Sequence, residues 1–374
     1  GTITFTGSLG SNRTITLPPP DVTFSADGTT VTIRTAPFLS GEAVTVGWTG
    51  LPSVDCNMPA QTATWSVTMP VVPCVPGTNG LLGTSMTRVP LGALGTFTEY
   101  FVAADQDPDG WVYVGGTSYL FRARKNGTWS FQDVEADAGL TTSHLGYTMV
   151  IDGPNIYTVD DTTSTTASTP RVYRISSDGG QTWNVENAAT FPQAPNDDLL
   201  SATAYGGRIY LLTEEFSAGT ELWSFDPSGG LPATASLDLT FGGADYQYCL
   251  GLALDAASVY TTCRLQRDTS AYAVIRVDRA TGTVTELTTA FPGNITAAAV
   301  HAHDDDGDGL ADYLYLGSQN EAAYFVCQPN GPAPWYDVLL EFGTGTGNYG
   351  LAFDPASNAL WAFDDDTLEF VKIQ

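Results

Sequence analysis

The sequence predicts an all-β protein: a six-bladed β-propeller, with seven blades as the alternative count, preceded by a small immunoglobulin-like β-sandwich. A strand–turn–strand phrase recurs six times, and the second strand of each phrase carries a central aromatic residue. These aromatic residues are spaced by 44, 53, 50, 55 and 46 positions: Tyr113, Tyr157, Tyr210, Tyr260, Tyr315 and Trp361. Repeats of about 40–50 residues with four short strands are typical of propeller blades, whose two faces are buried by neighbouring blades.

The region before the first repeat has a different pattern and is predicted to form the sandwich, over residues 1–75. Alternation of apolar and polar residues in 30–35, 43–48 and 62–67 indicates strands with one buried face. We count roughly six strands, whereas immunoglobulin-like sandwiches have about seven, so the module is predicted to be short of one strand. Residues 76–85 are the predicted linker and 86–374 the propeller.

The closure of the ring follows from the last repeat, which ends at Gln374 directly after its third strand. Its fourth strand must therefore come from elsewhere in the chain. Residues 86–91, just before the first repeat, are the predicted donor. Pairing this early strand with the last blade removes an exposed sheet edge.

Each repeat continues with a third short strand after the aromatic one, and the first five add a turn and a fourth strand. The predicted third strands are 120–122, 172–174, 222–224, 274–276, 324–326 and 369–371.

The charge balance excludes some partners. Asp plus Glu number 41 and Lys plus Arg 14, which gives a formal net charge of −27. Such a surface repels DNA, RNA and anionic lipid, so no nucleic-acid partner is expected. No apolar stretch approaches 18 residues, so no membrane insertion is expected either. The abundance of Thr and Gly with few basic residues favours a secreted or cell-surface protein.

Five cysteines support an oxidising compartment. Cys56 and Cys74 flank one hairpin-sized loop, and Cys249 and Cys263 flank another. The spacing predicts two local disulfides and leaves Cys327 as the odd thiol. The alternative is five reduced, buried cysteines.

The strongest chemical motif is the acidic segment 304–312, Asp-Asp-Asp-Gly-Asp-Gly-Leu-Ala-Asp. Calcium takes six to eight hard oxygen ligands, and alternate carboxylates around a glycine turn can surround one ion. The predicted calcium ligands are the Leu310 carbonyl and the side chains of Asp304, Asp306, Asp308 and Asp312. The alternative is a solvated acidic hairpin. Asp105, Asp107 and Asp109 occupy the equivalent place in the first repeat and form a second candidate calcium site.

The loop 304–312 lacks the closing Glu of a helix-loop-helix calcium loop, because that position is Tyr315. It resembles the strand-loop-strand calcium loops of integrin-type and pilus-tip-adhesin propellers. A second motif, Ser-x-Asp-x-Gly-x-Thr-Trp, is formed by Ser176, Asp178, Gly180, Thr182 and Trp183. It resembles the Asp-box of sialidase-like propellers. The resemblance implies a structural role, in which the Asp caps the turn and the Trp packs between blades.

The sialidase-like resemblance raises the alternative of a glycosidase or glycan-binding module, with Trp111, Tyr119 and Trp335 as candidate aromatic contacts. Sialidases use an arginine triad and a Phe/Tyr-Arg-Ile-Pro signature. That signature is not present, and arginine is sparse early in the ring. Catalysis is therefore not the favoured function, although chance carboxylate pairs among 41 acids leave the question open.

Three histidines are present. His301 and His303 alternate along one predicted inner strand, so both side chains face the same way. They are candidate ligands for copper or zinc, and the alternative is two ordinary residues near a strand end.

The favoured function is a calcium-stabilised extracellular adhesion or structural subunit. Self-association is one expected partnership: the Thr- and Ile-rich segment 2–17 could complete a neighbour's sandwich by strand addition and build a head-to-tail fibre. Pairing of that segment within its own sandwich is the simpler alternative. Surface glycans or proteins are the other expected partners.

Overall fold

The computed structural model describes the chain in separate segments, and all structural statements below concern these residues. They are 2–7, 12–16, 22–24, 31–33, 43–51, 61–68, 85–90, 101–105, 107, 110–116, 119–125, 131–140, 148–159, 171–177, 182–193, 195, 199–213, 219–288, 299–304, 307–317, 322–331, 334–341, 350–354, 357–364 and 367–374.

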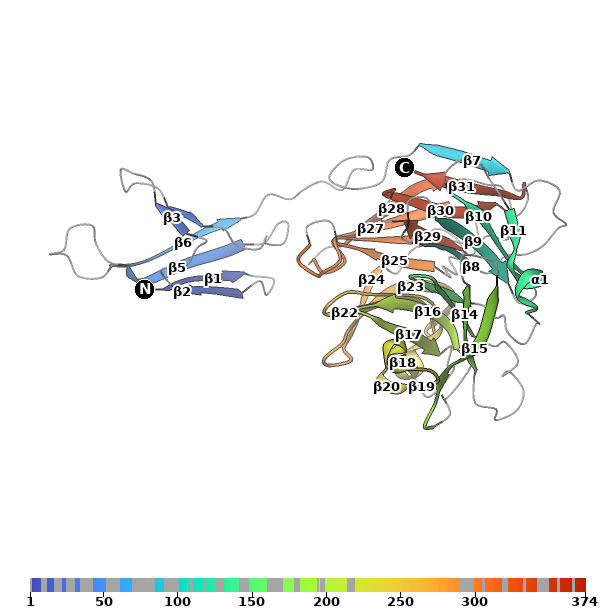
Figure 1. Cartoon of the computed structure of the whole chain (residues 1–374). Coiled ribbons are helices and arrows are strands. Elements are labelled where there is room, and N and C mark those ends of the chain that lie inside the picture. The colour runs from blue at the N-terminus through green and yellow to red at the C-terminus, as the bar shows by residue number, and fades with distance from the viewer. Residues whose placement is uncertain are drawn as a thin grey trace.

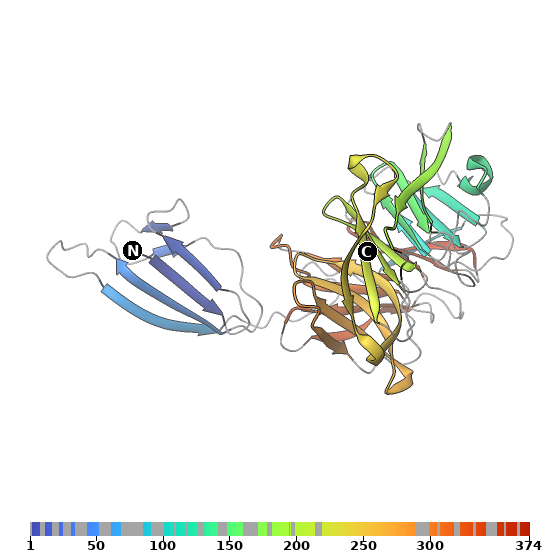
Figure 2. The same ribbon diagram turned by 90° about the horizontal axis from the view of Figure 1, so that it is seen from below.

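The propeller has six blades, as predicted, and each contains an antiparallel sheet of four strands (Figures 1 and 2). The blades, each written from the innermost strand outward, are β8 (Phe101–Ala104), β9 (Trp111–Gly116), β10 (Tyr119–Arg124) and β11 (Phe131–Asp133); β12 (Met149–Asp152), β13 (Asn155–Val159), β14 (Val172–Ser177) and β15 (Trp183–Thr190); β16 (Leu199–Tyr205), β17 (Arg208–Thr213), β18 (Thr220–Phe225) and β20 (Ser236–Phe241); β21 (Tyr246–Leu254), β22 (Ser258–Leu265), β23 (Asp268–Asp278) and β24 (Val284–Thr288); β25 (Ala299–His303), β26 (Tyr313–Gly317), β27 (Ala322–Cys327) and β28 (Trp335–Glu341); and β29 (Leu351–Asp354), β30 (Ala359–Asp364), β31 (Glu369–Ile373) and β7 (Met86–Pro90).

The apolar core is divided among the junctions between blades. The described residues form six clusters of buried side chains, and each cluster draws its members from two neighbouring blades. The six repeated aromatic residues lie in the second strands and are all buried, with no more than 5% of any side chain exposed. Their burial explains the repeat physically, because each aromatic ring fills one face of a sheet that cannot bury itself.

The early strand β7 closes the ring by pairing antiparallel with β31, so that Val89 lies opposite Phe370 (Figure 1). This is the segment that the sequence predicts for this role. Arg88 donates hydrogen bonds to the Asp364 carboxylate and, at 3.1 Å, to Glu369. The chain end is held as well, since the Gln374 amide donates to the Ser85 carbonyl at 3.0 Å.

Several elements were not predicted. β19 (Ala233–Thr234) leaves the third blade and pairs in parallel with β15, which gives the second blade a fifth strand. Helix α1 (Val134–Ala138) begins where the Asp133 side chain accepts from the Ala136 amide. The 3-10 turns η2 (Pro227–Gly229) and η3 (Gly243–Asp245) are also present. No described helix is long and apolar enough to cross a membrane.

The N-terminal region contains six described strands in two sheets, one of four strands in the order β2 (Asn12–Thr16), β1 (Thr2–Gly7), β5 (Ala43–Leu51) and β6 (Gln61–Thr68), and one of two, β3 (Val22–Phe24) and β4 (Val31–Ile33). Ile3 and Phe5 are buried whereas Thr4 is exposed, as the alternation predicts. β1 is an inner strand with both neighbours from its own chain. The immunoglobulin-like assignment stays a prediction.

The disulfide between Cys249 and Cys263 is confirmed, and it joins the adjacent strands β21 and β22. Cys327 is disulfide-bonded too, so the prediction that it is the odd thiol is wrong. Cys56 and Cys74 lie outside the described residues.

Candidate functional site

Aspartates gather at one end of the ring because the innermost strands all run in the same direction. Asp152 and Asp354 end β12 and β29, and Asp105, Asp255 and Asp304 directly follow β8, β21 and β25. At this position the side chain can reach the turn after its own strand or the loop of the next blade. We call these five residues the inner-strand aspartates.

Asp255 connects the fourth blade to the fifth. Its carboxylate is 3% exposed and accepts five hydrogen bonds, from the Ala257 and Ser258 amides, the Tyr260 hydroxyl, the Ala311 amide and the Asn330 side chain. The last two donors belong to the fifth blade. Burial beside this carboxylate raises the pKa of the Tyr260 hydroxyl. The buried charge is thus fully hydrogen-bonded, which is the condition under which burial of a carboxylate is tolerated.

The acidic loop 304–312 is folded tightly around Asp304, whose two oxygens accept from the Gly307 amide at 2.7 Å and the Gly309 amide at 2.8 Å. Both glycines have positive φ, +77° and +89°, a conformation that other residues rarely adopt. Asp308 accepts from the Leu310 amide at 2.8 Å. The loop begins after β25 and ends before β26, so it is a strand-loop-strand element, as predicted.

The fit of this loop to calcium rests on oxygen chemistry. The predicted ligands Asp304, Asp308, Leu310 and Asp312 are described, whereas Asp306 lies outside the described residues. Over the described segments alone, no three His, Cys, Asp or Glu side chains lie close enough to hold a metal ion. The carboxylate and carbonyl oxygens are nevertheless the donor types that calcium prefers.

The equivalent loop of the first blade contains a built-in cation. The Lys125 ammonium group donates to the backbone carbonyls of Asp105 and, at 3.1 Å, Asp107, and it lies 3.4 Å from the Asp105 carboxylate. It also pairs with Asp354 of the sixth blade at 3.1 Å, and its side chain is only 3% exposed. Lys125 thus supplies the positive charge that the sequence-based prediction assigned to a second calcium ion. Asp109 lies outside the described residues.

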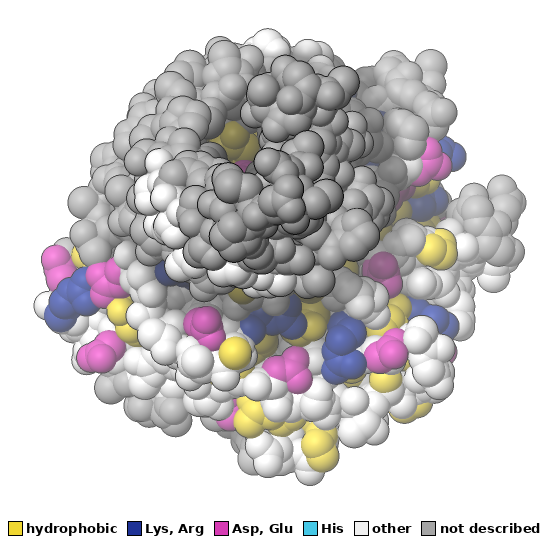
Figure 3. All heavy atoms as spheres, turned by 90° about the vertical axis from the view of Figure 1, so that its left-hand side faces the viewer, with side chains coloured by type: hydrophobic (Ala, Val, Ile, Leu, Met, Phe, Trp, Pro, Cys, Tyr) yellow, Lys and Arg dark blue, Asp and Glu magenta, His cyan; other side chains and the backbone are white. Residues whose placement is uncertain are grey.

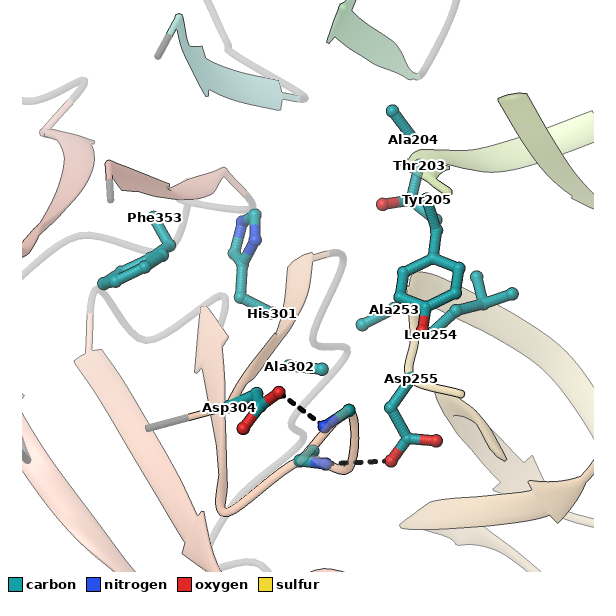
Figure 4. A pocket seen from close by; sticks show the side chains of 12 residues that line it. Thr203, Ala204, Tyr205, Ala253, Leu254, Asp255, His301, Ala302, Asp304 and Phe353 are labelled. Atoms are coloured by element: carbon teal, nitrogen blue, oxygen red, sulfur yellow. Dashed lines mark hydrogen bonds between the residues drawn. The ribbon is translucent and has the colours of Figure 1, made fainter. Parts of the chain in front are cut away.

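A pocket of about 310 Å³ opens beside the acidic loop, at the same end of the ring (Figure 4). Its walls come from the innermost strands of the third to sixth blades. Tyr205 and Asp255 lie on one side in Figure 4, and His301 and Phe353 on the other. Asp304 lines the pocket as well, so the candidate calcium loop and the pocket share one carboxylate.

The two histidines have separate environments. The His301 Nε2–H donates to the Leu351 carbonyl at 2.7 Å, and burial lowers the pKa of the imidazole. His303 packs against Phe353, with ring centroids 4.8 Å apart. With Nε2 of His301 engaged by a backbone carbonyl, only Nδ1 is left to accept a bond or a metal ion.

The residues of the Asp-box motif extend in sequence from the end of β14 to the start of β15. Ser176, Thr182 and Trp183 are described, and Asp178 and Gly180 lie outside the described residues. Trp183 packs against the cluster shared by the first and second blades. Its ring also lies 4.8 Å from the Arg122 guanidinium of the first blade. Trp183 therefore lies between the first and second blades.

The aromatic residues proposed for glycan contact are in different situations. The guanidinium groups of Arg122 and Arg124 lie 4.0 and 4.1 Å from the Trp111 ring centroid. Tyr119 stacks on Phe121 at 5.6 Å. The side chain of Trp335 lies outside the described part of the chain. The arginines over Trp111 compete with stacking of a sugar on that ring.

Sequence reasoning missed the residues that link the blades and line the pocket. Lys125, Tyr205, Asp255 and Phe353 carry no motif of their own. Asp255 and Asp354 share the end-of-strand position with Asp105 and Asp304, so alignment of the six repeats against one another was the signal that could have found them.

Comparisons with known proteins find similar folds but no matching family. No protein-family model matches the chain, and no curated protein matches it either. Among solved structures, the chain is similar to the PQQ-bound form of an aldose sugar dehydrogenase from Streptomyces coelicolor, with a TM-score of 0.52 and 11% identity over 78% of this chain and 100% of that one.

Two other solved structures show similar agreement. An auxiliary nutrient binding protein from Bacteroides thetaiotaomicron gives a TM-score of 0.52 and 11% identity over 100% of this chain and 90% of that one. The PQQ domain of pyranose dehydrogenase from Coprinopsis cinerea gives a TM-score of 0.51 and 11% identity over 78% of this chain and 96% of that one. At such low identity these likenesses bear on the fold alone.

Proposed function

We propose that this chain is a secreted or cell-surface β-propeller that binds calcium in loop 304–312 and serves as an adhesion or structural subunit, without catalysis of its own. The observation that carries the proposal is the loop itself. Asp304 accepts hydrogen bonds from two glycine amides, which fix its carboxylate in a loop whose sequence holds four further acidic residues. A divalent cation would relieve the repulsion among these charges.

A comparison of the acidic loops of the first and fifth blades supports a bound cation in the loop of the fifth. In the first blade, the Lys125 ammonium group bonds the oxygens around Asp105. In the fifth blade, the residue that follows the third strand is Gln328, which brings no charge. The first-blade loop thus has a lysine beside its acids, whereas at the corresponding position the fifth blade has a neutral residue, and its loop would take a cation from solution.

The extracellular assignment rests on chemistry of the whole chain. Disulfides such as Cys249–Cys263 persist in oxidising compartments. The acidic surface suits a medium with abundant free calcium, and Figure 3 shows acidic and basic side chains intermixed over the described part of one face.

Calcium is expected to stabilise the propeller. Free calcium at 100 times its dissociation constant should raise the free energy of unfolding by about 2.7 kcal/mol, because binding to the folded state alone shifts the equilibrium by mass action. Urea unfolding in calcium chloride and in EGTA measures this difference. Asp304→Asn should remove most of it.

The matched control is Asp278→Asn. Asp278 accepts from the Ala280 and Thr281 amides in an exposed turn of the fourth blade, so it resembles Asp304 in geometry but lies in no acidic loop. This variant should keep the full response to calcium. An equal response of wild type and Asp304→Asn would refute calcium binding at this loop.

Imaging of untreated native material separates the structural role from adhesion. Regular fibres in negative-stain electron microscopy would support a structural polymer. Because β1 is already paired on both sides within its chain, addition of this strand to a neighbour requires β1 to leave its own sheet. Single particles in the images would favour adhesion through the ring.

A further inference from the structure

The pocket beside the acidic loop has the size of a small-molecule site. Its volume of about 310 Å³ lies at the lower end of the range for ligand pockets, roughly 300–1,000 Å³. The innermost strands of four different blades build its walls, so the site is part of the rigid ring. Its occupant can be inferred from the groups that face it.

The lining offers aromatic faces and hydrogen-bond acceptors. Phe353 and His301 lie on one side of the space and Tyr205 on the other (Figure 4). The His301 Nε2–H is used by the Leu351 carbonyl, so Nδ1 remains as an acceptor. The Asp304 oxygens each accept one backbone amide and retain a lone pair. The remaining lining donors are the hydroxyl groups of Thr203 and Tyr205.

The pocket is electrostatically negative. Asp255 and Asp304 line it, and no lysine or arginine is among its described lining residues. Arg279 is not a lining residue, but its guanidinium lies over the Tyr205 ring, 5.5 Å from the ring centroid. Even so, the pKa of Tyr205 is raised, first by burial and next by the charge of Asp255, whose effect exceeds the opposing effect of Arg279.

We propose that this pocket binds a small organic cation, an amine or a quaternary ammonium group of the order of ten non-hydrogen atoms or fewer. An ammonium group gains from a carboxylate at contact distance and from the faces of aromatic rings within about 6 Å. A neutral sugar would need donors and acceptors in comparable number, whereas the described lining is dominated by acceptors. The net charge of −27 would raise the local concentration of such a cation.

Titration calorimetry with tetramethylammonium chloride tests the proposal on the full chain in EGTA. Tetramethylammonium should bind with a dissociation constant of roughly 1–10 mM, as expected for a ligand of a few atoms. The neutral analogue tert-butanol and glucose should bind at least about tenfold more weakly. Tighter binding of glucose than of tetramethylammonium would overturn the proposal.

Three variants locate the site. Tyr205→Leu and Phe353→Leu each remove one aromatic face and should weaken tetramethylammonium binding about 3- to 30-fold. Tyr205→Phe keeps the ring and should bind as wild type, which guards against a variant that merely folds poorly. Unchanged binding in both leucine variants would overturn the proposal, as would undetectable binding in wild type at 50 mM ligand, ~5–50 times the expected dissociation constant.

Tetramethylammonium binding measured in EGTA does not depend on whether the calcium proposal is correct. In EGTA the pocket has its full negative charge, and Asp304→Asn should weaken tetramethylammonium binding there. Calcium bound at Asp304 should weaken it as well, because the ion neutralises the shared carboxylate. A protein that binds tetramethylammonium but not calcium would refute only the function proposed above. Calcium binding without tetramethylammonium binding would refute only the cation pocket.

Discussion

Replacing Lys125 with methionine is expected to lower the free energy of unfolding of the propeller by about 3–5 kcal/mol, the loss seen when one partner of a buried ion pair is removed. The ammonium group bonds two backbone carbonyls and lies 3.1 Å from the Asp354 carboxylate, which is fully buried. Methionine retains the apolar stem, so the effect isolates the charge. Two carboxylates would then lie close together with no cation between them.

The position of Lys125 explains why the effect should reach the whole ring. Lys125 follows β10 of the first blade, and Asp354 ends β29 of the sixth. The ion pair therefore crosses the junction that β7 closes on its outer side. Equilibrium unfolding in urea, followed by tryptophan fluorescence, gives the free energy.

Lys372→Met is the matched control, because Lys372 is the other of the two lysines in the chain. It lies on β31, where its ammonium nitrogen is 5.5 Å from the Trp361 ring centroid. Its loss should cost less than about 1 kcal/mol. Similar losses in the two variants would show that Lys125 does not hold a buried junction.

Asp255→Asn is the second change with a large expected effect, about 3–5 kcal/mol. Asparagine replaces one carboxylate oxygen with an NH2 group, which donates where the carboxylate accepts, so several of the five donors would lose their partner. The Ala311 amide, which belongs to the acidic loop, is one of them. The variant should therefore also bind calcium more weakly, although Asp255 is not a predicted ligand.

Urea unfolding and calcium titration of the same samples check both expectations. Asp278→Asn serves again as the control, because Asp278 makes local turn contacts that do not cross between blades. A destabilised Asp255→Asn variant with unchanged calcium affinity would mean that this aspartate does not position the loop.

The parts of the fold that the sequence predicts correctly are those that repeat. Each central aromatic residue, such as Tyr260 or Trp361, fills a junction between blades, so its spacing reports the blade directly. The closing strand could be predicted because an unpaired edge at the end of the last blade requires a partner. Strand β19 could not be predicted from the sequence, because it is only two residues long and pairs with a strand of a different blade.

The sequence predicted only those parts of the candidate site whose residues lie close together in the chain. The acids of loop 304–312 are adjacent in sequence, so their pattern is visible there. Lys125 is 20 residues from Asp105 and 229 from Asp354, and only the closed ring brings the three together. The second calcium site was therefore predicted from acids alone, without the internal cation that pairs with Asp105. The pocket likewise joins residues from four blades.

The metal content of the protein as isolated tests the central claim most directly. Inductively coupled plasma mass spectrometry of wild type, dialysed against calcium-free buffer without chelator, should find about one calcium per chain, since one loop offers a set of oxygen ligands without an internal cation. Asp304→Asn should lose this calcium and Asp278→Asn should keep it. Calcium absent from wild type after addition of excess ion, or equally present in Asp304→Asn, would contradict a calcium-stabilised propeller built around this loop.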